Sequence, residues 1–422
     1  MRICLISVEF FINKSGGFGR ATRTIGRELA ALGVEVYAVV PRQGGQGPEE
    51  QHDGVTVLGF SKHRPWDAYR LCKEIDADVY HSCEPSMITV FARWARPQRK
   101  HVITFRDPRN WDDWRKELER PARSKLQVVS NWLFEANPLV RHAVRRADGV
   151  YSIGRYLVPK IGKIYGVDSE FLPTPAPVPV AVTKASRPTV GWLARRDPVK
   201  RPEIFLQLPP RFPDVTFRFA GSALDPQWER HLKETYGSAP NLEWLGRIDQ
   251  FRDPRDHSEF LGNAWVMVNA STKEAMPNAF LEAAAHRAAI LSGLDPDGFA
   301  SDFGYHVRKR DPQMKYPDAE DFARGLAWLL EGDRWLDQGQ RGYKHVASTF
   351  KTELAIQRHI EIYRQHLGLS EETAPGEKAL PRRVKVPGQR AVTQPFQQPR
   401  DAGQVGPQHV DRGVARDVGE DR

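Results

Sequence analysis

The sequence predicts an α/β protein with two Rossmann-like domains, each built around a parallel sheet. Short apolar segments alternate with longer stretches of helical periodicity from the N-terminus to about residue 367, which is the pattern of stacked βα units. A proline-rich stretch interrupts this alternation after residue 170, and the alternation then starts again. The 422 residues are also enough for two or three compact domains.

The first domain is predicted over residues 1–170 from six short apolar segments. Between the first two of them, Ile25, Leu29 and Leu32 recur at helical spacing, so residues 20–32 are expected to form an amphipathic crossover helix. The expected strands of this domain are Ile3–Ser7, Val34–Val40, Val55–Phe60, Asp78–His81, Val102–Phe105 and Val150–Ile153.

A linker is expected over residues 171–186, which begin with FLPTPAPVP. Each proline fixes its own φ, lacks an N–H donor and pushes the preceding residue toward extended backbone, so this segment cannot be helical. A second domain is expected over residues 187–350, with a helix at Pro277–Arg287. Its expected strands are Thr189–Leu193, Thr216–Ala220, Leu242–Leu245, Trp265–Asn269 and Ala289–Leu291.

Two C-terminal helices and a tail complete the predicted fold. One apolar stripe ends at Leu330, and a second lies within residues 351–369, where Ile356, Ile360 and Tyr363 recur at helical spacing. Residues 370–422 are rich in Pro, Gly and Gln and nearly lack large apolar side chains. Such a segment cannot bury enough surface to offset its ordering entropy, so we expect a disordered tail.

Composition and charge exclude several classes of protein. The 62 Lys and Arg exceed the 53 Asp and Glu, giving a net charge of +9, but no block of cations with interleaved aromatic residues of the RNA-binding kind and no zinc-finger spacing is present. Nucleic acid is therefore not an expected partner. No segment approaches the roughly 18–20 apolar residues of a membrane span. The first residues read as a strand, and the three cysteines have no metal-ligand spacing, which favours a cytoplasmic protein.

The first βα turn, Lys14–Arg20, reads KSGGFGR and leads directly into the expected helix. Glycines there let a ligand approach the backbone, and a helix N-terminus offers N–H groups to a phosphate. Gly17-x-Gly19 half-matches a dinucleotide fingerprint and raises an NAD-dependent oxidoreductase as an alternative. However, Thr22 replaces the third glycine and Glu35 comes too early for the ribose-binding acid. A tight turn without a ligand is an equally good interpretation.

The segment after the first strand of the second domain carries four cations within seven residues: Arg195, Arg196, Lys200 and Arg201. Fixed cations at the carboxyl end of a strand can neutralise a leaving diphosphate. Taken alone, the segment is better explained as a solvated basic loop, but it does not stand alone.

Two acids frame the start of the helix at residue 277. Glu274 lies in the loop after a strand, and Glu282 lies inside the helix, four residues from Asn278 and from His286. Both can face one cleft, and a carboxylate suits a sugar because it accepts hydrogen bonds from vicinal hydroxyls. Two solvated acids are the plain alternative, but the Ala-rich surroundings of Glu282 argue against solvation there.

Together these segments resemble those of the GT-B glycosyltransferases, specifically the retaining family-4 enzymes of glycosyl transferases group 1. The resemblance covers residues 1–367 and follows the order Gly-Gly, then Arg195-x4-Lys200, then Glu274-x7-Glu282. It implies the GT-B fold, in which two Rossmann-like domains face a central cleft and the last helix returns to the first domain.

The resemblance also implies a hexosyltransferase that moves a sugar from a nucleotide-sugar, with retention, to a glycan or lipid-linked acceptor in surface or extracellular polysaccharide biosynthesis. The nucleotide-sugar is a substrate, and neither a metal ion nor another cofactor is expected. Arg195 and Lys200 would hold the diphosphate and stabilise the leaving group. Gly16 and Gly17 would lie against the diphosphate or the acceptor, and Glu282 would bind the ribose.

Further roles follow from the same resemblance. Glu274 would contact the donor sugar, and His81 would also interact with it unless it is a structural histidine at the strand end, which is as good an interpretation. Other donor contacts, largely through backbone groups, are expected at Arg247, Met276, Asn278 and Ala279.

The sequence departs from the family at two places on the acceptor side. Cys83 stands where family members often have the second His of a His-x-His motif, and Arg106 stands where they often have His before Asp107. Arg106 and Arg109 are candidates for contact with an anionic acceptor, such as a phosphorylated lipid or an acidic glycan. The departures also raise the alternative of an inactive homologue that binds a nucleotide or a glycan.

The segment 110–146 combines tryptophans with many cations. A surface of this composition can bind an anionic membrane, which would place the protein as a peripheral protein at the inner face of the membrane. Acids are interleaved with these cations, which favours an ordinary solvated helical insert. These acids are Asp112, Asp113, Glu117, Glu119 and Glu135.

Overall fold

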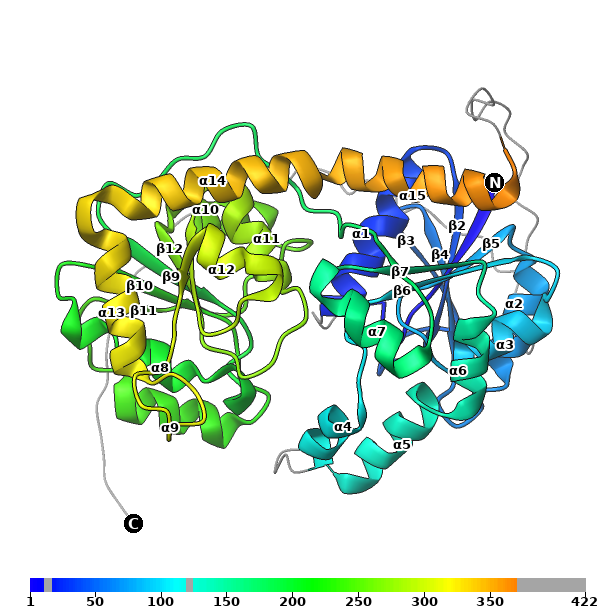
Figure 1. Cartoon of the computed structure of the whole chain (residues 1–422), viewed down its shortest axis with the longest axis horizontal. Coiled ribbons are helices and arrows are strands. Elements are labelled where there is room, and N and C mark those ends of the chain that lie inside the picture. Colours follow the sequence, from blue (N-terminus) through cyan, green and yellow to red (C-terminus); the bar gives the residue numbers. More distant parts are fainter. Residues whose placement is uncertain (11–16, 119–123, 370–422) are drawn as a thin grey trace, which may run out of the picture. The chain divides into compact units, whose positions relative to one another are not determined.

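The computed structural model describes residues 1–10, 17–118 and 124–369 (Figure 1). The chain forms two mainly parallel β-sheets flanked by helices, which confirms the predicted α/β class with two Rossmann-like domains. Gly16 lies outside the described residues. The tail 370–422, for which the sequence predicts disorder, also lies outside them.

The first sheet has eight strands in the order β3-β4-β2-β1-β5-β6-β7-β8. Its neighbours pair in parallel, except that β3 and β4 form an antiparallel hairpin at one edge. The strands are β1 (Arg2–Ile6), β2 (Glu35–Pro41), β3 (Glu49–His52), β4 (Val55–Phe60), β5 (Val79–Ser82), β6 (Lys100–Phe105), β7 (Gly149–Ser152) and β8 (Glu170–Phe171). The helices are α1 (Gly17–Ala31), α2 (Asp67–Ile75), α3 (Met87–Ala95), α4 (Trp111–Leu118), α5 (Lys125–Glu135), α6 (Pro138–Arg145) and α7 (Val158–Tyr165).

The packing of α1 on this sheet follows from its sequence. The central strand β1 is buried from Ile3 to Ile6, as its continuous apolar run predicts for a parallel strand covered on both faces. α1 turns Ile25 and Leu29 to the sheet. A Cβ at Gly26 would lie 2.9 Å from the Val55 side chain, so the absence of a side chain there lets the helix approach closely.

The second sheet has six parallel strands in the order β11-β10-β9-β12-β13-β14. They are β9 (Thr189–Leu193), β10 (Thr216–Ala220), β11 (Leu242–Trp244), β12 (Val266–Asn269), β13 (Ala289–Ser292) and β14 (Gly304–His306). The helices are α8 (Pro202–Leu206), α9 (Pro226–Tyr236), α10 (Pro254–Asn263), α11 (Asn278–Ala285), α12 (Phe299–Asp302), α13 (Ala319–Leu330), α14 (Arg334–Thr349) and α15 (Thr352–Leu367). Aromatic side chains form much of this sheet's core: Trp192, Phe205, Phe217 and Phe219.

Every predicted strand is present within two residues of its expected bounds, but the structure adds β3, β8 and β14. β3 reads EEQH and has no apolar residue, and β8 is only two residues long, so neither produces the apolar alternation of a strand. The additional helix α14 carries Gly339 and Gly342 on its buried side, where they pack against the segment that contains α11. These glycines weaken its helical pattern in the sequence.

The last helix, α15, packs on the first sheet. Its Ile356, Ile362 and Tyr363 belong to the same buried cluster as Ile3 and Leu5 of β1. In Figure 1 this helix (orange) lies beside α1 and the first sheet. Within the described ranges, no helix combines the length and the apolar character needed to cross a membrane.

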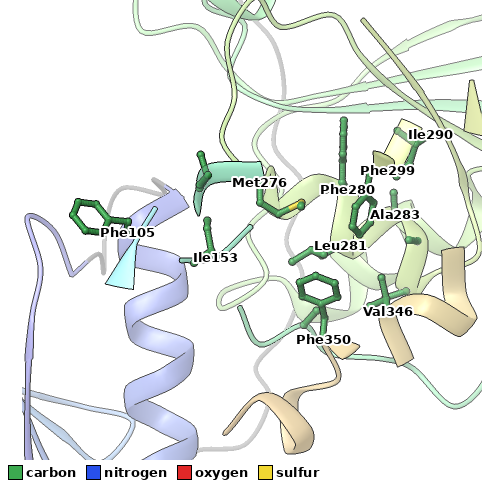
Figure 2. Close-up of a cluster of buried hydrophobic side chains, with 14 of the residues drawn as sticks. Phe105, Ile153, Met276, Phe280, Leu281, Ala283, Ile290, Phe299, Val346 and Phe350 are labelled. Carbon is green, nitrogen blue, oxygen red and sulfur yellow. The ribbon is translucent and has the colours of Figure 1, made fainter. Parts of the chain in front are cut away.

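A cluster of buried apolar side chains includes residues from both halves of the chain (Figure 2). Phe105 ends β6 and Ile153 follows β7 of the first sheet. Met276 lies in the loop before α11, Leu281 lies on α11, and Phe350 precedes α15. This cluster fixes the loop before α11, which carries several of the predicted site residues.

Candidate functional site

Two of the predicted site residues meet at one edge of the second sheet. Lys200 ends a short 3₁₀ turn after β9, and Glu274 lies in the loop after β12, the parallel neighbour of β9. The ammonium group of Lys200 donates a hydrogen bond to Oε1 of Glu274, which also accepts from Ser271 Oγ at 2.8 Å. The Thr272 N–H donates to the Val199 carbonyl at 3.0 Å and ties the two loops together.

The four cations of the segment after β9 have separate environments. Arg195 is half exposed, and its guanidinium lies 2.9 Å from Asp197. Arg196 points inward, where it pairs with Glu229 and stacks over the Phe219 ring at 4.5 Å. Arg196 therefore supports the fold, whereas Arg195 and Lys200 remain near the loops of the candidate site.

Glu282 is a buried carboxylate on α11, with 7% of its surface exposed. Its Oε1 accepts a hydrogen bond from the Arg20 guanidinium, and His257 Nε2 lies 3.5 Å from its Oε2. Burial opposes ionisation of this carboxyl, but the charges of Arg20, His257 and His286 outweigh burial and hold its pKa at about 2. Glu282 is therefore ionised at neutral pH, and a solvated position is excluded.

Arg20 is a site residue that the motif reading missed. It follows the glycine loop on α1 and reaches both Glu282 and Gln250, to whose Oε1 it donates at 2.5 Å. A cavity of about 20 Å³ lies between these groups and Thr174 of the linker, which is room for one water molecule. A nucleotide is far larger, so Arg20 must leave Glu282 when a ligand of that size binds there. Its place directly after the glycines was the available sequence signal.

Glu9 is the second residue that the motif reading missed. It follows β1, and its carboxylate accepts the Gly19 N–H at 3.0 Å, so it occupies the N-terminus of α1 where a phosphate was expected. Burial raises the pKa of Glu9 to about 7, although the N–H groups of Gly19 and Phe18 and the charge of Arg195 oppose this rise. Its position at the carboxyl end of a strand was the only signal in the sequence.

The start of α11 faces the start of α1. The Asn278 side-chain amide donates to the Gly17 carbonyl at 3.3 Å, so these two predicted residues are in contact. Pro277 precedes α11 and makes no side-chain cap, and the first turn contains no acid, so neither a cap nor a first-turn acid offsets the partial positive charge of this helix end at Asn278 and Ala279. The Met276 side chain is buried in the cluster of Figure 2, which leaves its backbone as the group that a donor can contact.

Arg247 lies just beyond β11. Its guanidinium pairs with Asp249 at 2.6 Å, and the carbonyl of the preceding Gly246 accepts the Gly221 N–H at 3.0 Å.

His81 differs from the predicted sugar contact. It is fully buried, with Nδ1 2.7 Å from the Tyr363 hydroxyl and Nε2 2.7 Å from Thr104 Oγ1. Burial first, and then the neighbouring His359 and Arg106, lower its pKa well below the usual value. Because both ring nitrogens are engaged inside the protein, the geometry favours the structural histidine over a group that meets the donor sugar.

Arg106 is also in the interior, with 3% of its surface exposed. Its Nη1 donates to Thr174 Oγ1 at 3.4 Å, and its Nε has no partner among the described residues. The backbone N–H groups of Arg106 and Asp107 donate to Glu84 at 2.7 and 3.0 Å. The expectation that Arg106 presents a cation to an acceptor therefore needs correction, because the guanidinium is covered.

Arg109 and Asp107 neutralise one another. Arg109 lies 2.9 Å from Asp107 and 3.4 Å from Glu135, and its guanidinium also stacks over the Trp114 ring at 4.9 Å. Asp107 further pairs with Lys273, the residue before Glu274, at 3.5 Å. Arg109 is therefore paired with two carboxylates, and its contact with an anionic acceptor stays a prediction.

A search of the described residues for three or more His, Cys, Asp or Glu side chains that together could hold a metal ion found none. The cysteines Cys4, Cys72 and Cys83 are free and buried.

Comparison with protein families gives two matches. Residues 16–172 match a glycosyl transferase 4-like domain, and residues 187–332 match glycosyl transferases group 1. The two ranges together cover more than half of the chain. The comparison with curated proteins gave no match.

Comparison with solved structures finds chains of the same fold. Sucrose-phosphate synthase from Thermosynechococcus elongatus is 16% identical with a TM-score of 0.65, and the match covers 87% of this chain and 99% of that one. Anabaena HepE, solved with UDP and glucose, is 15% identical with a TM-score of 0.63, over 86% and 100%. A glycosyltransferase from Rickettsia africae is 14% identical with a TM-score of 0.64, over 87% and 99%.

Proposed function

We propose a reaction for this site on one premise: the chain belongs to the glycosyl transferases group 1 family and has the GT-B fold of those glycosyltransferases. The proposed reaction moves a sugar from a nucleotide-sugar donor to a glycan or lipid-linked acceptor, with retention at the anomeric carbon. Its setting would be surface or extracellular polysaccharide biosynthesis. That HepE was solved with UDP and glucose supports a nucleoside diphosphate as the leaving group.

One observation carries this proposal: cations and an uncapped helix end gather beside two carboxylates. Lys200 contacts Glu274 at the carboxyl ends of β9 and β12, and α11 begins between Glu274 and Glu282. As the glycosidic bond opens, negative charge grows on the diphosphate and positive charge grows on the sugar. Lys200, Arg195 and the N–H groups of α11 stabilise the former, because fixed donors cost no reorganisation during the reaction.

In this proposal Lys200 and Arg195 provide the positive charge that a bound metal ion supplies in other transferases. The reaction then needs neither a metal ion nor another cofactor. Glu274 would leave Lys200 to the diphosphate and contact the donor sugar, whose developing positive charge a carboxylate stabilises.

Glu282 would hold the ribose of the donor. An ionised carboxylate only accepts hydrogen bonds, so two vicinal hydroxyls satisfy it well. The ribose would take the place of the Arg20 guanidinium, which now satisfies Oε1 of Glu282.

The test is a thermal-shift panel of UDP, GDP, ADP, CDP and NAD against the wild type and Glu282→Ala. A ligand at about 100 times its Kd adds about 2.7 kcal/mol to the free energy of unfolding, which raises Tm by some degrees. We expect one nucleoside diphosphate to stabilise the wild type and to lose this effect in Glu282→Ala. Stabilisation by NAD alone would contradict the proposal.

The alternative of an inactive homologue rests on the acceptor side, where His81 and Arg106 are enclosed in the interior. An activity assay distinguishes the transferase from the inactive homologue. Its substrates are sugar conjugates of the nucleotide that stabilises the protein, with glucose and then other hexoses, and it measures the release of nucleoside diphosphate. Binding without any release, with or without glycan acceptors, would favour the homologue.

A further inference from the structure

An exposed apolar stripe runs along α5. Leu126, Val129 and Leu133 are spaced three and four residues apart, so they lie on one face of the helix. All three are exposed, and Leu126 has 83% of its surface in solvent. An ordinary solvated helix turns such a stripe toward the core, but in α5 only Val128 is buried.

The neighbouring helices also expose apolar side chains. Trp111 of α4 is 66% exposed, and its ring packs edge-on against Trp132 of α5 with the ring centroids 6.2 Å apart. Leu139 of α6 is exposed as well. We call this surface the α4–α6 face. Its members are Trp111, Leu126, Val129, Leu133 and Leu139.

The cations of the same helices remain at the surface. Arg115 lies one turn after Trp111 on α4, and Lys125 lies one turn before Val129 on α5, so each flanks the apolar side chains. The exposed cations of α4, α5 and α6 are Arg115, Lys116, Lys125, Arg141, Arg145 and Arg146.

The acids that are interleaved in the sequence mostly turn inward. Glu117 is buried, Asp113 pairs with Lys160 at 2.8 Å, and Glu135 pairs with Arg109 at 3.4 Å. Asp112 alone is exposed among the acids described on these helices. Alternating opposite charges favoured an ordinary solvated insert in the sequence. This alternation is largely absent from the surface of the described helices.

We propose that the α4–α6 face binds the surface of a bilayer that contains anionic lipid. Its apolar side chains would enter the boundary between headgroups and acyl chains, and its cations would meet the lipid phosphates. A combination of exposed apolar side chains and mostly positive charge, with Asp112 beside Arg115 as the exposed acid, fits this occupant better than a protein surface, which would need complementary acids. The inference does not depend on the proposed transfer reaction.

The test is co-sedimentation with vesicles of phosphatidylglycerol and, separately, of phosphatidylcholine. The wild type binds phosphatidylglycerol vesicles, binds them less at high salt because the charges are screened, and binds phosphatidylcholine weakly. In Leu126→Glu/Leu133→Glu the affinity for phosphatidylglycerol vesicles falls about tenfold or more, because charged groups replace the inserted side chains. Arg115→Glu/Lys125→Glu lowers the affinity and its salt dependence together.

The matched control is Leu224→Glu, a leucine of the second half that is 72% exposed and lies outside this face. It binds vesicles as the wild type does. All variants melt at the wild-type temperature, because the replaced side chains are exposed. No binding to phosphatidylglycerol at low salt, or an equal loss in Leu224→Glu, overturns the proposal. A wild-type dimer that Leu126→Glu/Leu133→Glu dissociates in sedimentation velocity also overturns it, in favour of a second copy of the chain.

Discussion

The proposed donor side of this molecule and the interior of its first domain differ in how their polar and charged groups are satisfied. On the donor side, Lys200 pairs with Glu274 and Arg20 pairs with Glu282, and each partner is a side chain that a ligand can replace. In the interior of the first domain, His81 is enclosed, and its hydrogen bond to Tyr363 holds the last helix to the first sheet. Replaceable pairs mark a binding site, whereas enclosed pairs mark a part of the core.

The positions at which the sequence matches the family also differ in this way from the positions at which it departs from the family. The donor-side motif Glu274-x7-Glu282 is intact and lies at loops and helix starts. At the departures, Arg106 is covered and Arg109 lies between two carboxylates. A family motif therefore predicts a site only at the positions that keep the residues of the motif. Where a residue is replaced, its role has to be worked out from the structure.

The largest expected effect is a loss of kcat at the proposed donor site. Lys200→Met should lower kcat by about 10²–10³-fold with a smaller change in KM, because a cation that stabilises the leaving diphosphate in the transition state is lost. Release of nucleoside diphosphate from the donor measures it. Lys233→Met, at an exposed lysine of α9, is the control; an equal kcat in Lys200→Met and Lys233→Met would contradict the assigned role.

The next effect tests whether His81 is structural. His81→Leu leaves the Thr104 and Tyr363 hydroxyls without their partner inside the core, so the free energy of unfolding should fall by about 2–4 kcal/mol. Urea unfolding measures this loss, and kcat of the remaining folded protein should stay near that of the wild type. A stable variant with abolished turnover would return His81 to the catalytic residues.

A smaller effect of opposite sign is expected at Arg106. Its guanidinium is buried, and no carboxylate pairs with it among the described residues, so Arg106→Met should raise the free energy of unfolding by about 1–2 kcal/mol. If acceptor use falls while nucleoside diphosphate binding is kept, the arginine is retained for function at a cost in stability. Lower stability in the variant would show instead that the buried charge is well satisfied.

The smallest effect concerns Glu9 and pH. Its folded pKa of about 7 is above that of an unfolded glutamate, so the folded state holds the proton more tightly. Its contribution to stability is full below the unfolded pKa and is lost as pH rises through about 7, by about 1 kcal/mol after screening by solvent. Glu9→Gln should lack this loss in urea unfolding at pH 5 and pH 8.

Glu9 also gives a binding test. At pH 8 its carboxylate occupies the N-terminus of α1, so Glu9→Gln should bind a nucleoside diphosphate more tightly than the wild type does. At pH 6 the two should differ less, and the same ligand titration in both proteins cancels the phosphate's own ionisation. A constant ratio across pH would mean that the phosphate does not meet this helix end.

The fold could be predicted well because buried parallel strands appear in the sequence as short continuous apolar runs. The runs at Val55–Phe60 and Thr189–Leu193 have the bounds that the structure gives to β4 and β9. Elements without an apolar pattern, such as β3, escaped prediction. The burial of Glu282 could also be anticipated, because its helix is otherwise composed of Ala, Leu and Phe.

Partners far apart in the chain could not be predicted. Arg20 and Glu282 are 262 residues apart, and only the packing of the start of α1 near α11 brings them together. The enclosure of Arg106 depends in the same way on Thr174 of the linker. Local spacing identifies a residue's chemistry, but whether that residue is covered is decided by segments elsewhere in the sequence.

The position of α15 has a consequence for the order in which this protein is made. The core of the first sheet includes Ile356, Ile362 and Tyr363, and His81 bonds to the hydroxyl of the last of these. A ribosome releases the first sheet long before it releases this helix. The second domain can therefore close its own core first, while the first domain waits with an apolar face uncovered until nearly 370 residues have been synthesised.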